Sequence, residues 1–297
     1  MLTNFLSFNL NQTYAALEVS GEDAATFLQG QLTNDIHQVT NQHAIYSGFC
    51  NPKGRLIGFF IIIKFNESYL LILPRSISEN IHKKLSMYIL RSKVKLTMQD
   101  EAIQIYGLLD KNKNSNNEAL PKNHLDVLNL NECHMIKLQG VGRFMLVGLK
   151  DACQALIHEN PELLVNQGIN VWKQEEILSG SPNIYTATQE AFIPQSLNLD
   201  LMDAINFKKG CYTGQEIVAR THYLGKPKRR MFIAKAQAEL HSSIGDSIDF
   251  NGQAIGHIVD LVIHEGRTDL LIELLLDHTD KGLTIDGHSI ALKHPSL

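Results

Sequence analysis

Apolar segments joined by short turn signatures constrain the fold of this 297-residue chain more than any other feature. The segment "NPKG" at residues 51–54 separates the apolar runs "AIYSGFC" and "RLIGFFIIIK", a pattern typical of a β-hairpin. Asn251-Gly252 and Asp286-Gly287 are two-residue turn signatures, which favour tight hairpins because both residues of each pair accept positive φ angles. The sequence therefore predicts strands that pair with their neighbours along the chain.

The first two thirds of the chain also contain helical patterns. The strand-like segment "YAALEV" at residues 14–19 precedes an amphipathic stretch. Further on, one helix face is predicted from the spacing of Ile77, Ile81, Leu85 and Tyr88. A further helical segment, "NVWKQEEILSG", is expected to stop at Gly180. Strands and helices in this order predict an α+β layer fold rather than a regular parallel α/β fold.

We expect a domain boundary near residue 228, because only short strand patterns follow it. Residues 1–227 form the first region, with two subdomains separated by a polar, Asn-rich loop at residues 110–124. Residues 228–297 form a small C-terminal β-domain.

The beginning of the chain and its apolar runs predict a soluble, cytoplasmic protein with no membrane partner. The first residues lack a basic segment followed by an apolar core, so no signal peptide is expected. The longest apolar run, at residues 56–63, is too short to span a bilayer.

The net charge of −4 argues against general nucleic-acid binding, but the charges are unevenly distributed. Residues 206–235 contain a single acid, Glu216, and eight basic residues, so this window carries +7 and the remainder of the chain −11. The basic residues are Lys208, Lys209, Arg220, Lys226, Lys228, Arg229, Arg230 and Lys235. An acidic chain therefore concentrates its positive charge in one segment.

That segment surrounds one of four scattered cysteines. Cys50, Cys133, Cys153 and Cys211 contain no C-x-x-C pair and no zinc-ligand spacing, so no metal site is expected and the thiols are expected to be reduced. Cys50, Cys133 and Cys153 lack any sequence context that suggests reactivity and are interpreted as buried residues.

Cys211 has a different context, in "FKKGCYTGQEIVART" at residues 207–221. Thr213 and Glu216 have the spacing of a capping box, which predicts a helix start near Gly214 and leaves Cys211 just outside the positive end of that helix. The positive end of the helix favours the thiolate form of Cys211, and the positive charges of Lys208 and Lys209 favour it too. Two interpretations stay open: a small buried residue, or a thiolate that acts as a nucleophile or carrier.

Two more features are open to structural and functional interpretations. The run "GKPKRR", which contains Lys226, Lys228, Arg229 and Arg230, is either a solvated loop or a contact for a polyanion such as tRNA. Trp172, the single tryptophan, is either a core residue or a platform on which a heterocycle stacks.

The segment "FIPQSLNLDLMDAINFKKGCYTGQEIVAR" at residues 192–220 resembles the signature of the YgfZ family, and "FLQGQLTNDI" and "NPKG" are similar to two further family blocks. The resemblance implies a folate-binding fold like that of the glycine-cleavage aminomethyltransferases, with domains around a central channel and a C-terminal antiparallel β-barrel. It implies tetrahydrofolate, or another folate, as the cofactor and iron–sulfur enzymes, including tRNA-modifying ones, as clients. Cys211, with Lys209, is implied as the reactive centre. The implied ligand-binding residues are Trp172, Tyr14, Tyr212, Gly210, Gln215 and Glu216. Cys211 is expected to face the same pocket, so that the cysteine and the folate share one site.

The sequence departs from the related aminomethyltransferases at two places. The stretch "KGRLIGFF" lacks the catalytic aspartate that those enzymes carry after the hairpin, so classical aminomethyl transfer is not expected. Leu178 replaces the acid that precedes their pterin-binding turn, and Glu175 or Glu176 could substitute for it. Tyr14 replaces a tryptophan that is usual in the bacterial members.

These observations give one leading hypothesis and two alternatives. The leading hypothesis is a tetrahydrofolate-binding accessory protein that supports the assembly or repair of iron–sulfur enzymes. The first alternative is a folate-dependent one-carbon transferase that uses Cys211. The second is direct docking of tRNA on Lys226, Lys228, Arg229 and Arg230.

Overall fold

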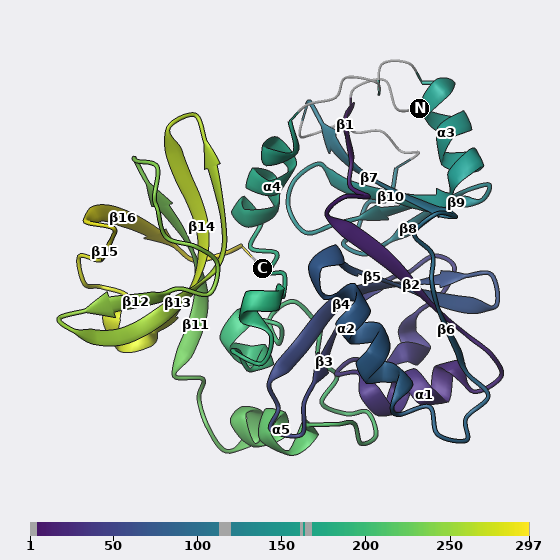
Figure 1. The fold of residues 1–297 in the computed structure, drawn as a ribbon, viewed down its shortest axis with the longest axis horizontal. Coiled ribbons are helices and arrows are strands. Elements are labelled where there is room, and N and C mark those ends of the chain that lie inside the picture. Colours follow the sequence, from purple (N-terminus) through teal and green to yellow (C-terminus); the bar gives the residue numbers. More distant parts are fainter. Residues whose placement is uncertain (1–4, 113–119, 161–162, 164–167, 297) are drawn as a thin grey trace.

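The computed structural model describes residues 5–112, 120–160, 163 and 168–296. The described strands form three sheets in which all paired neighbours are antiparallel. Two of the sheets lie side by side, and the third, formed by the end of the chain, stands apart with helix α4 (Ile169–Leu178) beside it (Figure 1). The three predicted hairpins, at residues 51–54, 251–252 and 286–287, are confirmed, whereas other strands pair with strands distant in the sequence.

The first sheet has the strand order β3-β4-β5-β2-β6 and carries the predicted hairpin. Its strands are β2 (Tyr14–Ser20), β3 (Ile45–Cys50), β4 (Leu56–Phe65), β5 (Ser68–Pro74) and β6 (Lys95–Met98). Helices α1 (Ala24–Gln31) and α2 (Arg75–Ser86) and the 3-10 turn η1 (Ile36–Gln38) accompany this sheet. Helix α2 buries Ile77, Ile81 and Leu85 against it, as predicted, but it ends at Ser86, so Tyr88, which was predicted on the same face, lies outside the helix and is exposed.

The second sheet has the order β1-β7-β10-β9-β8. Its strands are β1 (Phe5–Asn9), β7 (Ile103–Asp110), β8 (Val127–Leu130), β9 (Cys133–Lys137) and β10 (Arg143–Leu149). Helix α3 (Lys150–His158) packs on β7 and β10. The predicted polar loop at 110–124 falls partly outside the described residues, because 113–119 are not described.

The third sheet, a nearly closed antiparallel barrel, has the order β12-β13-β14-β11-β16-β15. Its strands are β11 (Arg229–Ala236), β12 (Ser247–Phe250), β13 (Gln253–His264), β14 (Arg267–Leu275), β15 (Thr284–Ile285) and β16 (His288–Lys293), with the turn η5 (Leu276–His278). Both predicted two-residue turns form, with φ of 51° and 78° at Asn251-Gly252 and 52° and 78° at Asp286-Gly287.

The α+β prediction with a C-terminal antiparallel barrel is therefore confirmed. The third sheet has a core of its own inside the barrel. It also contributes Met231, Ile233, Val259 and Leu271 to the large core that the first two sheets share. Docking of the barrel on the rest of the chain thus buries apolar side chains from both sides.

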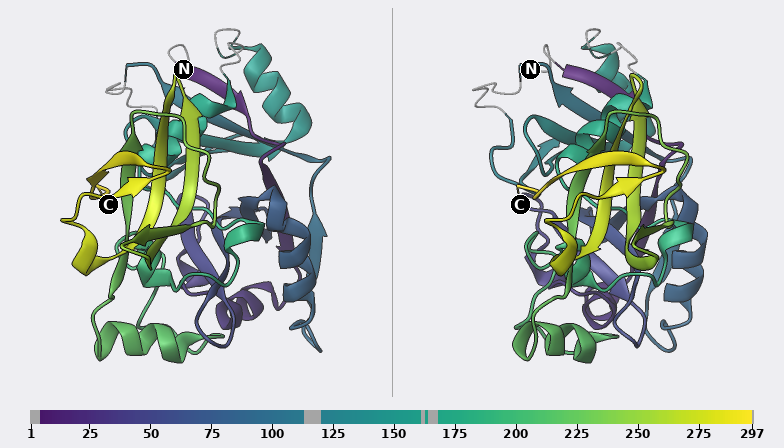
Figure 2. Two further views of the ribbon diagram at one scale, coloured as in Figure 1. Left: turned by 60° about the vertical axis from the view of Figure 1, so that its left-hand side comes forward. Right: turned by 90° about the vertical axis from the view of Figure 1, so that its left-hand side faces the viewer.

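The remaining elements connect α4 to the barrel. They are the 3-10 turns η3 (Thr186–Thr188) and η4 (Pro194–Leu197) and helix α5 (Gln215–Tyr223). Helix α5 lies at one edge of the molecule in all three views, away from α4 (Figures 1 and 2). None of the helices in the described part of the chain is long and apolar enough to cross a membrane.

Candidate functional site

A cavity of about 400 Å³ lies between the start of β2 and helix α4. Tyr14, the first residue of β2, and Trp172, in α4, both line it although they are far apart in the sequence. The other lining residues are Gln12, Thr13, Pro74, Arg75, Ser76, Ile169, Lys173, Glu176 and Tyr185. The structure therefore brings together two of the three aromatic residues that the resemblance implied as ligand contacts, Tyr14 and Trp172 but not Tyr212.

Trp172 is both a wall of this cavity and a core residue. Only 1% of its surface is exposed, and its ring packs so closely on β7 that a Cβ added at Gly107 would lie 2.5 Å from the indole. The guanidinium of Arg143 lies 4.8 Å from the centre of the ring, a cation–π arrangement. The position of the indole is therefore fixed by β7 and β10 before any ligand arrives.

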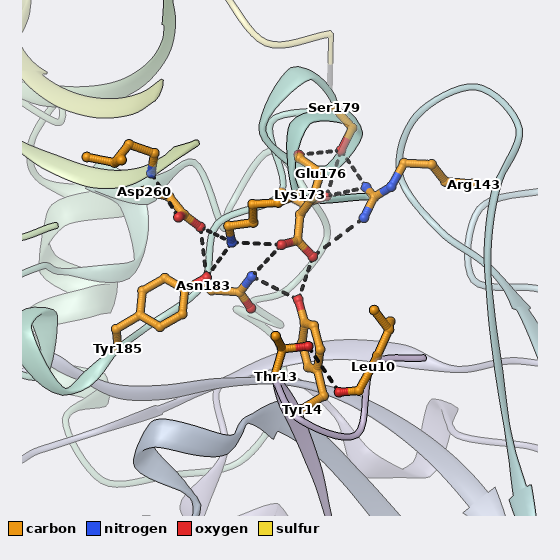
Figure 3. A network of polar contacts seen from close by, with 12 residues as sticks. Leu10, Thr13, Tyr14, Arg143, Lys173, Glu176, Ser179, Asn183, Tyr185 and Asp260 are labelled. Carbon is orange, nitrogen blue, oxygen red and sulfur yellow. Dashed lines mark hydrogen bonds and ion pairs between the residues drawn. The ribbon is translucent and has the colours of Figure 1, made fainter. Parts of the chain in front are cut away.

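The carboxylate of Glu176 is the centre of a buried polar network beside the cavity (Figure 3). One oxygen accepts a hydrogen bond of 2.5 Å from the hydroxyl of Tyr14, and the other accepts bonds from Asn183 (3.0 Å) and Lys173 (2.9 Å). The guanidinium of Arg143 adds a 3.6 Å ion pair. A carboxylate that is 4% exposed requires this many partners because burial removes its hydration.

Lys173 extends the network into the barrel. Its ammonium group lies 2.5 Å from a carboxylate oxygen of Asp260 on β13, and the hydroxyl of Tyr185 contacts both groups. Burial alone would lower the pKa of Lys173, but the carboxylates of Asp260 and Glu176 outweigh it and raise that pKa. Burial also raises the pKa of Glu176, but the positive charges of Lys173 and Arg143 lower it by more. The pKa of Glu176 therefore lies below its usual value. The network therefore keeps Lys173 and Glu176 charged at neutral pH.

A second, much smaller cavity of about 20 Å³ lies on the other side of Tyr14. Phe59 and Phe60, from the "KGRLIGFF" stretch that lacks the aspartate, line it together with Glu176 and Arg143. This space holds about one water molecule and excludes a pterin ring. Of the two acids that could substitute at Leu178, Glu176 lines both cavities.

Cys211 lies in an exposed loop at residues 208–214, before α5. Cys50, Cys133 and Cys153 are buried, so of the four thiols Cys211 alone is exposed. The flanking residues turn inward: the ring of Tyr212 is buried, and the ammonium group of Lys209 donates to the backbone carbonyls of Gln29 in the last turn of α1 and of Leu32 and Asn34 after it. The loop is therefore held on both sides while its thiol faces solvent.

Close packing of the Gly214 backbone against the β3–β4 turn fixes the other end of this loop. Gly214 has φ +84°, and a Cβ there would lie 2.4 Å from the backbone oxygen of Asn51 in the β3–β4 turn. The predicted helix start near Gly214 is confirmed, because α5 begins at Gln215. The predicted capping box of Thr213 and Glu216 is wrong: Gly214 is the N-cap residue and no side chain caps the helix. A left-handed glycine, not a threonine hydroxyl, makes the entry into α5.

The structure separates the residues that sequence analysis assigned to one site. Cys211, Lys209, Gly210, Tyr212, Gln215 and Glu216 do not line the cavity that Tyr14 and Trp172 share. Their loop and α5 pack on the β3–β4 turn, where Gly54 meets Ile217, at the edge of the molecule and away from α4, which lies between the barrel and the other sheets (Figure 1). The predicted single site is therefore two sites, an internal cavity and a surface loop.

Sequence analysis missed Arg143, Lys173, Asn183, Tyr185 and Asp260. Two of them carry a signal in hindsight, because Arg143 opens the apolar strand "RFMLVGL" and Asp260 interrupts "HIVDLVIH". A charged residue inside an apolar strand requires a buried partner. The identity of that partner is not readable from the sequence.

Among the described residues, no group of three or more His, Cys, Asp or Glu side chains could hold a metal ion. No protein-family model matches the chain.

Comparison with known sequences finds clear relatives. An uncharacterized protein of Haemophilus influenzae is 31% identical over 245 residues, which cover 81% of this chain and 78% of that protein. The tRNA-modifying protein YgfZ of Colwellia psychrerythraea is 30% identical over 241 residues, 80% of this chain and 74% of the relative. The protein of the same name from Aliivibrio fischeri is 30% identical over 295 residues, 94% and 88% of the two chains.

Among solved structures, the glycine cleavage system aminomethyltransferase T of Bartonella henselae has a TM-score of 0.67 and covers 99% of this chain and 86% of its own. At 15% identity this likeness shows the fold alone. The sequence relatives go further, since they match at about 30% identity over most of both chains. The chain belongs to the YgfZ family of tRNA-modifying proteins.

Proposed function

We propose that the protein binds tetrahydrofolate and acts as an accessory protein in the assembly or repair of iron–sulfur enzymes, including those that modify tRNA. The cavity in which Tyr14 and Trp172 meet carries this proposal. Membership of a family named for tRNA modification and the aminomethyltransferase fold support it.

The cavity fits a folate in size and in the chemistry of its lining. Its volume of about 400 Å³ lies in the usual range for ligand pockets, and its wall exposes mainly apolar atoms to the cavity. The rings of Tyr14 and Trp172 would bound the pterin, and Lys173 and Tyr185 supply polar groups. Arg75 at the same cavity offers a cation for the glutamate tail, although it already pairs with Asp100 at 2.8 Å. Tetrahydrofolate, when bound, would supply a carrier of one-carbon units.

The chain's own contribution at this cavity is to bind and orient. Tyr14 is held through its hydroxyl by Glu176 and Asn183, and Trp172 is held by Gly107 and Arg143. Both rings therefore stand in place without a ligand, which lowers the cost of ordering them on binding.

Cys211 would act at the surface, toward a client protein. Its thiol is exposed, and anchors at Lys209 and Gly214 fix the loop that carries it. A partner enzyme can approach such a thiol without any rearrangement of the loop. The alternative of a one-carbon transferase that uses Cys211 lacks this kind of support, because Cys211 does not line the folate-sized cavity.

A binding titration tests the folate proposal. We would titrate tetrahydrofolate into the protein under anaerobic conditions, follow Trp172 fluorescence corrected for ligand absorbance, and repeat the titration by calorimetry. Ile169→Asp places a negative charge at the cavity, where Ile169 is 39% exposed. We expect this variant to weaken binding by about tenfold or more, because like charges repel the folate carboxylates.

Leu276→Asp is the matched control, because Leu276 is 40% exposed and lies in η5, away from the cavity. Equal affinity of wild type and the control, with weaker binding to Ile169→Asp, supports the assignment. Silence in both fluorescence and calorimetry, or the same loss in both variants, would sink it.

A complementation experiment tests the role of Cys211. In a strain that lacks the protein, we expect the activity of an iron–sulfur tRNA-thiolating enzyme, read as thiolated nucleosides by mass spectrometry, to stay low with Cys211→Ala. Ser243→Ala, a small exposed residue in the barrel, should restore it fully at the same protein level. Full rescue by Cys211→Ala would remove the role given to this thiol and leave the folate proposal intact.

A further inference from the structure

A second large cavity, of about 440 Å³, lies where the chain passes from α5 into the barrel. Its walls come from the β3–β4 turn, η4, the end of α5, the connection to β11, and strands β13 and β14. Residues Arg55, Ala191, Ile193, Ser196, Thr221, Lys226, Pro227, Lys228, Arg229, His257 and Glu273 line it. None of them lines the folate-sized cavity.

The structure divides the eight basic residues of segment 206–235 into two groups. Four are already engaged: Lys209 with backbone carbonyls, Arg229 with Glu273, Arg230 with Asp200, and Lys235 with Asp269. The side chains of the other four, Lys208, Arg220, Lys226 and Lys228, have no hydrogen-bond or ion-pair partner among the described residues. Sequence analysis treated Lys226, Lys228, Arg229 and Arg230 as one basic run, but Arg230 turns to Asp200 and does not line the cavity.

The two unpaired lysines meet two arginines in this cavity. Arg55 and Arg229 line it with Lys226 and Lys228, and Glu273 is the single acid, so the lining carries a net +3 with His257 neutral. Glu273 holds Arg229 at 2.9 Å, and the backbone carbonyl of Ala191 holds Arg55. The cavity therefore has two fixed cations and two free ones, in a chain whose net charge is −4.

We propose that this cavity binds the phosphate groups of a single-stranded RNA segment. Lys226 and Lys228 are exposed and free to contact phosphate oxygens. The hydroxyls of Ser196 and Thr221 in the same wall already donate to the backbone carbonyls of Ile193 and Ile217, so the lysines carry the contact. Contacts of this type supply most of the affinity of proteins for nucleic-acid backbones.

Tyr223, at the end of α5, does not itself line the cavity, but its exposed ring lies close to it along the chain and offers a surface on which a base can stack. Tyr223 lies in the chain between Thr221 and Lys226, which both line the cavity, and 64% of Tyr223 is exposed. Its ring meets Phe207 and His222 at steep angles of 73° and 80°, so these contacts fix its orientation. Cations beside an exposed aromatic ring are the combination with which proteins bind single strands.

The concave shape favours a single strand over a duplex. A flexible strand can bend into the cavity and bring its phosphates to the cations, whereas a rigid double helix cannot enter it. An acidic protein segment would satisfy the lysines but would gain nothing from Tyr223. Binding of RNA here is independent of the folate cavity and goes beyond the function proposed above.

The test measures fluorescence anisotropy of a 5′-labelled oligouridine, on the order of 12 nucleotides long to span one such site. Lys226→Ala/Lys228→Ala removes two phosphate contacts, and we expect the log–log salt slope to become shallower by about 1.4. If the wild type and the variant bind equally at 1 M salt, this change in slope makes the variant bind about 25-fold more weakly at 0.1 M salt. Tyr223→Ala should weaken binding by about fivefold or more, and Tyr223→Phe should not.

Lys281→Ala/Lys293→Ala is the charge-matched control, since both lysines are exposed and neither lines the cavity. The proposal predicts that this control binds oligouridine as the wild type does. Three outcomes would overturn it: no binding by the wild type at low salt, an equal loss in the control, or displacement of the RNA by oligoglutamate of the same charge. Equal thermal unfolding of all variants shows that each loss is local.

Discussion

Two regions of this protein gather charged side chains in opposite ways. Around Glu176, the side chains of Glu176, Arg143 and Asp260 are buried and that of Lys173 is only 20% exposed, and each has partners within 2.5 to 3.6 Å. On the α5 surface, which we define as the loop at residues 208–214 and the connection at residues 224–228, the side chains of Lys208, Lys226 and Lys228 are exposed and have no partner among the described residues.

The difference follows from the cost of burying charge. A buried charge must be paired because it has lost its hydration, whereas an exposed lysine keeps its water and needs no partner. The Glu176 network therefore uses its charges to join β2, α4 and β13, and the α5 surface keeps its charges available for a ligand. We propose that the barrel, residues 228–297, unfolds together with the rest of the chain because Asp260 ties it to Lys173.

The largest effect should come from Lys173→Met, which removes the cation shared by Glu176 and Asp260. Two buried carboxylates would lose their partner, and we expect a loss of about 3–5 kcal/mol in the free energy of unfolding, measured with urea. The control is Lys93→Met, whose pair with Glu22 is 72% and 76% exposed and should contribute at most about 1 kcal/mol. Similar losses in the two variants would contradict the distinction between the two regions.

A smaller effect is expected from Gly214→Ala, which tests how the α5 surface is fixed. The positive φ and the 2.4 Å approach to Asn51 should cost about 1–3 kcal/mol in stability. At Gly210, one residue before Cys211, an added Cβ meets nothing within 4 Å and φ is not positive. Gly210→Ala should therefore leave thermal unfolding unchanged, and an equal shift in both variants would argue against backbone fit as the anchor of the loop.

The smallest effect concerns pH. Burial and then Lys137 lower the pKa of His124 from 6.5 to about 4. Between these values the unfolded chain binds more protons than the folded one, so stability must fall as the pH drops from 6.5 to 4. His124 is only partly buried, and we expect it to account for about 1 kcal/mol of that fall.

His124→Asn should flatten this part of the pH profile in urea unfolding, whereas the exposed His288→Asn should leave it as in the wild type. An unchanged profile in His124→Asn would mean that other groups carry the acid sensitivity.

Local signals in the sequence determined much of the fold. The turns at Asn251-Gly252 and Asp286-Gly287 and the face formed by Ile77, Ile81 and Leu85 were predictable, because backbone φ preferences and helical periodicity act over a few residues. The motif around Cys211 was also visible in the sequence, as was the start of the helix after it.

Only the tertiary structure decided which side chains meet. Tyr14, Glu176 and Asp260 come from three distant segments, and no local pattern states that their polar groups share one network. In the same way, Arg230 and Lys228 look alike in the sequence, yet Asp200 pairs with Arg230 and leaves Lys228 free. Secondary structure is set by neighbours in the chain, whereas the pairing of charges depends on desolvation and on partners that folding alone brings near.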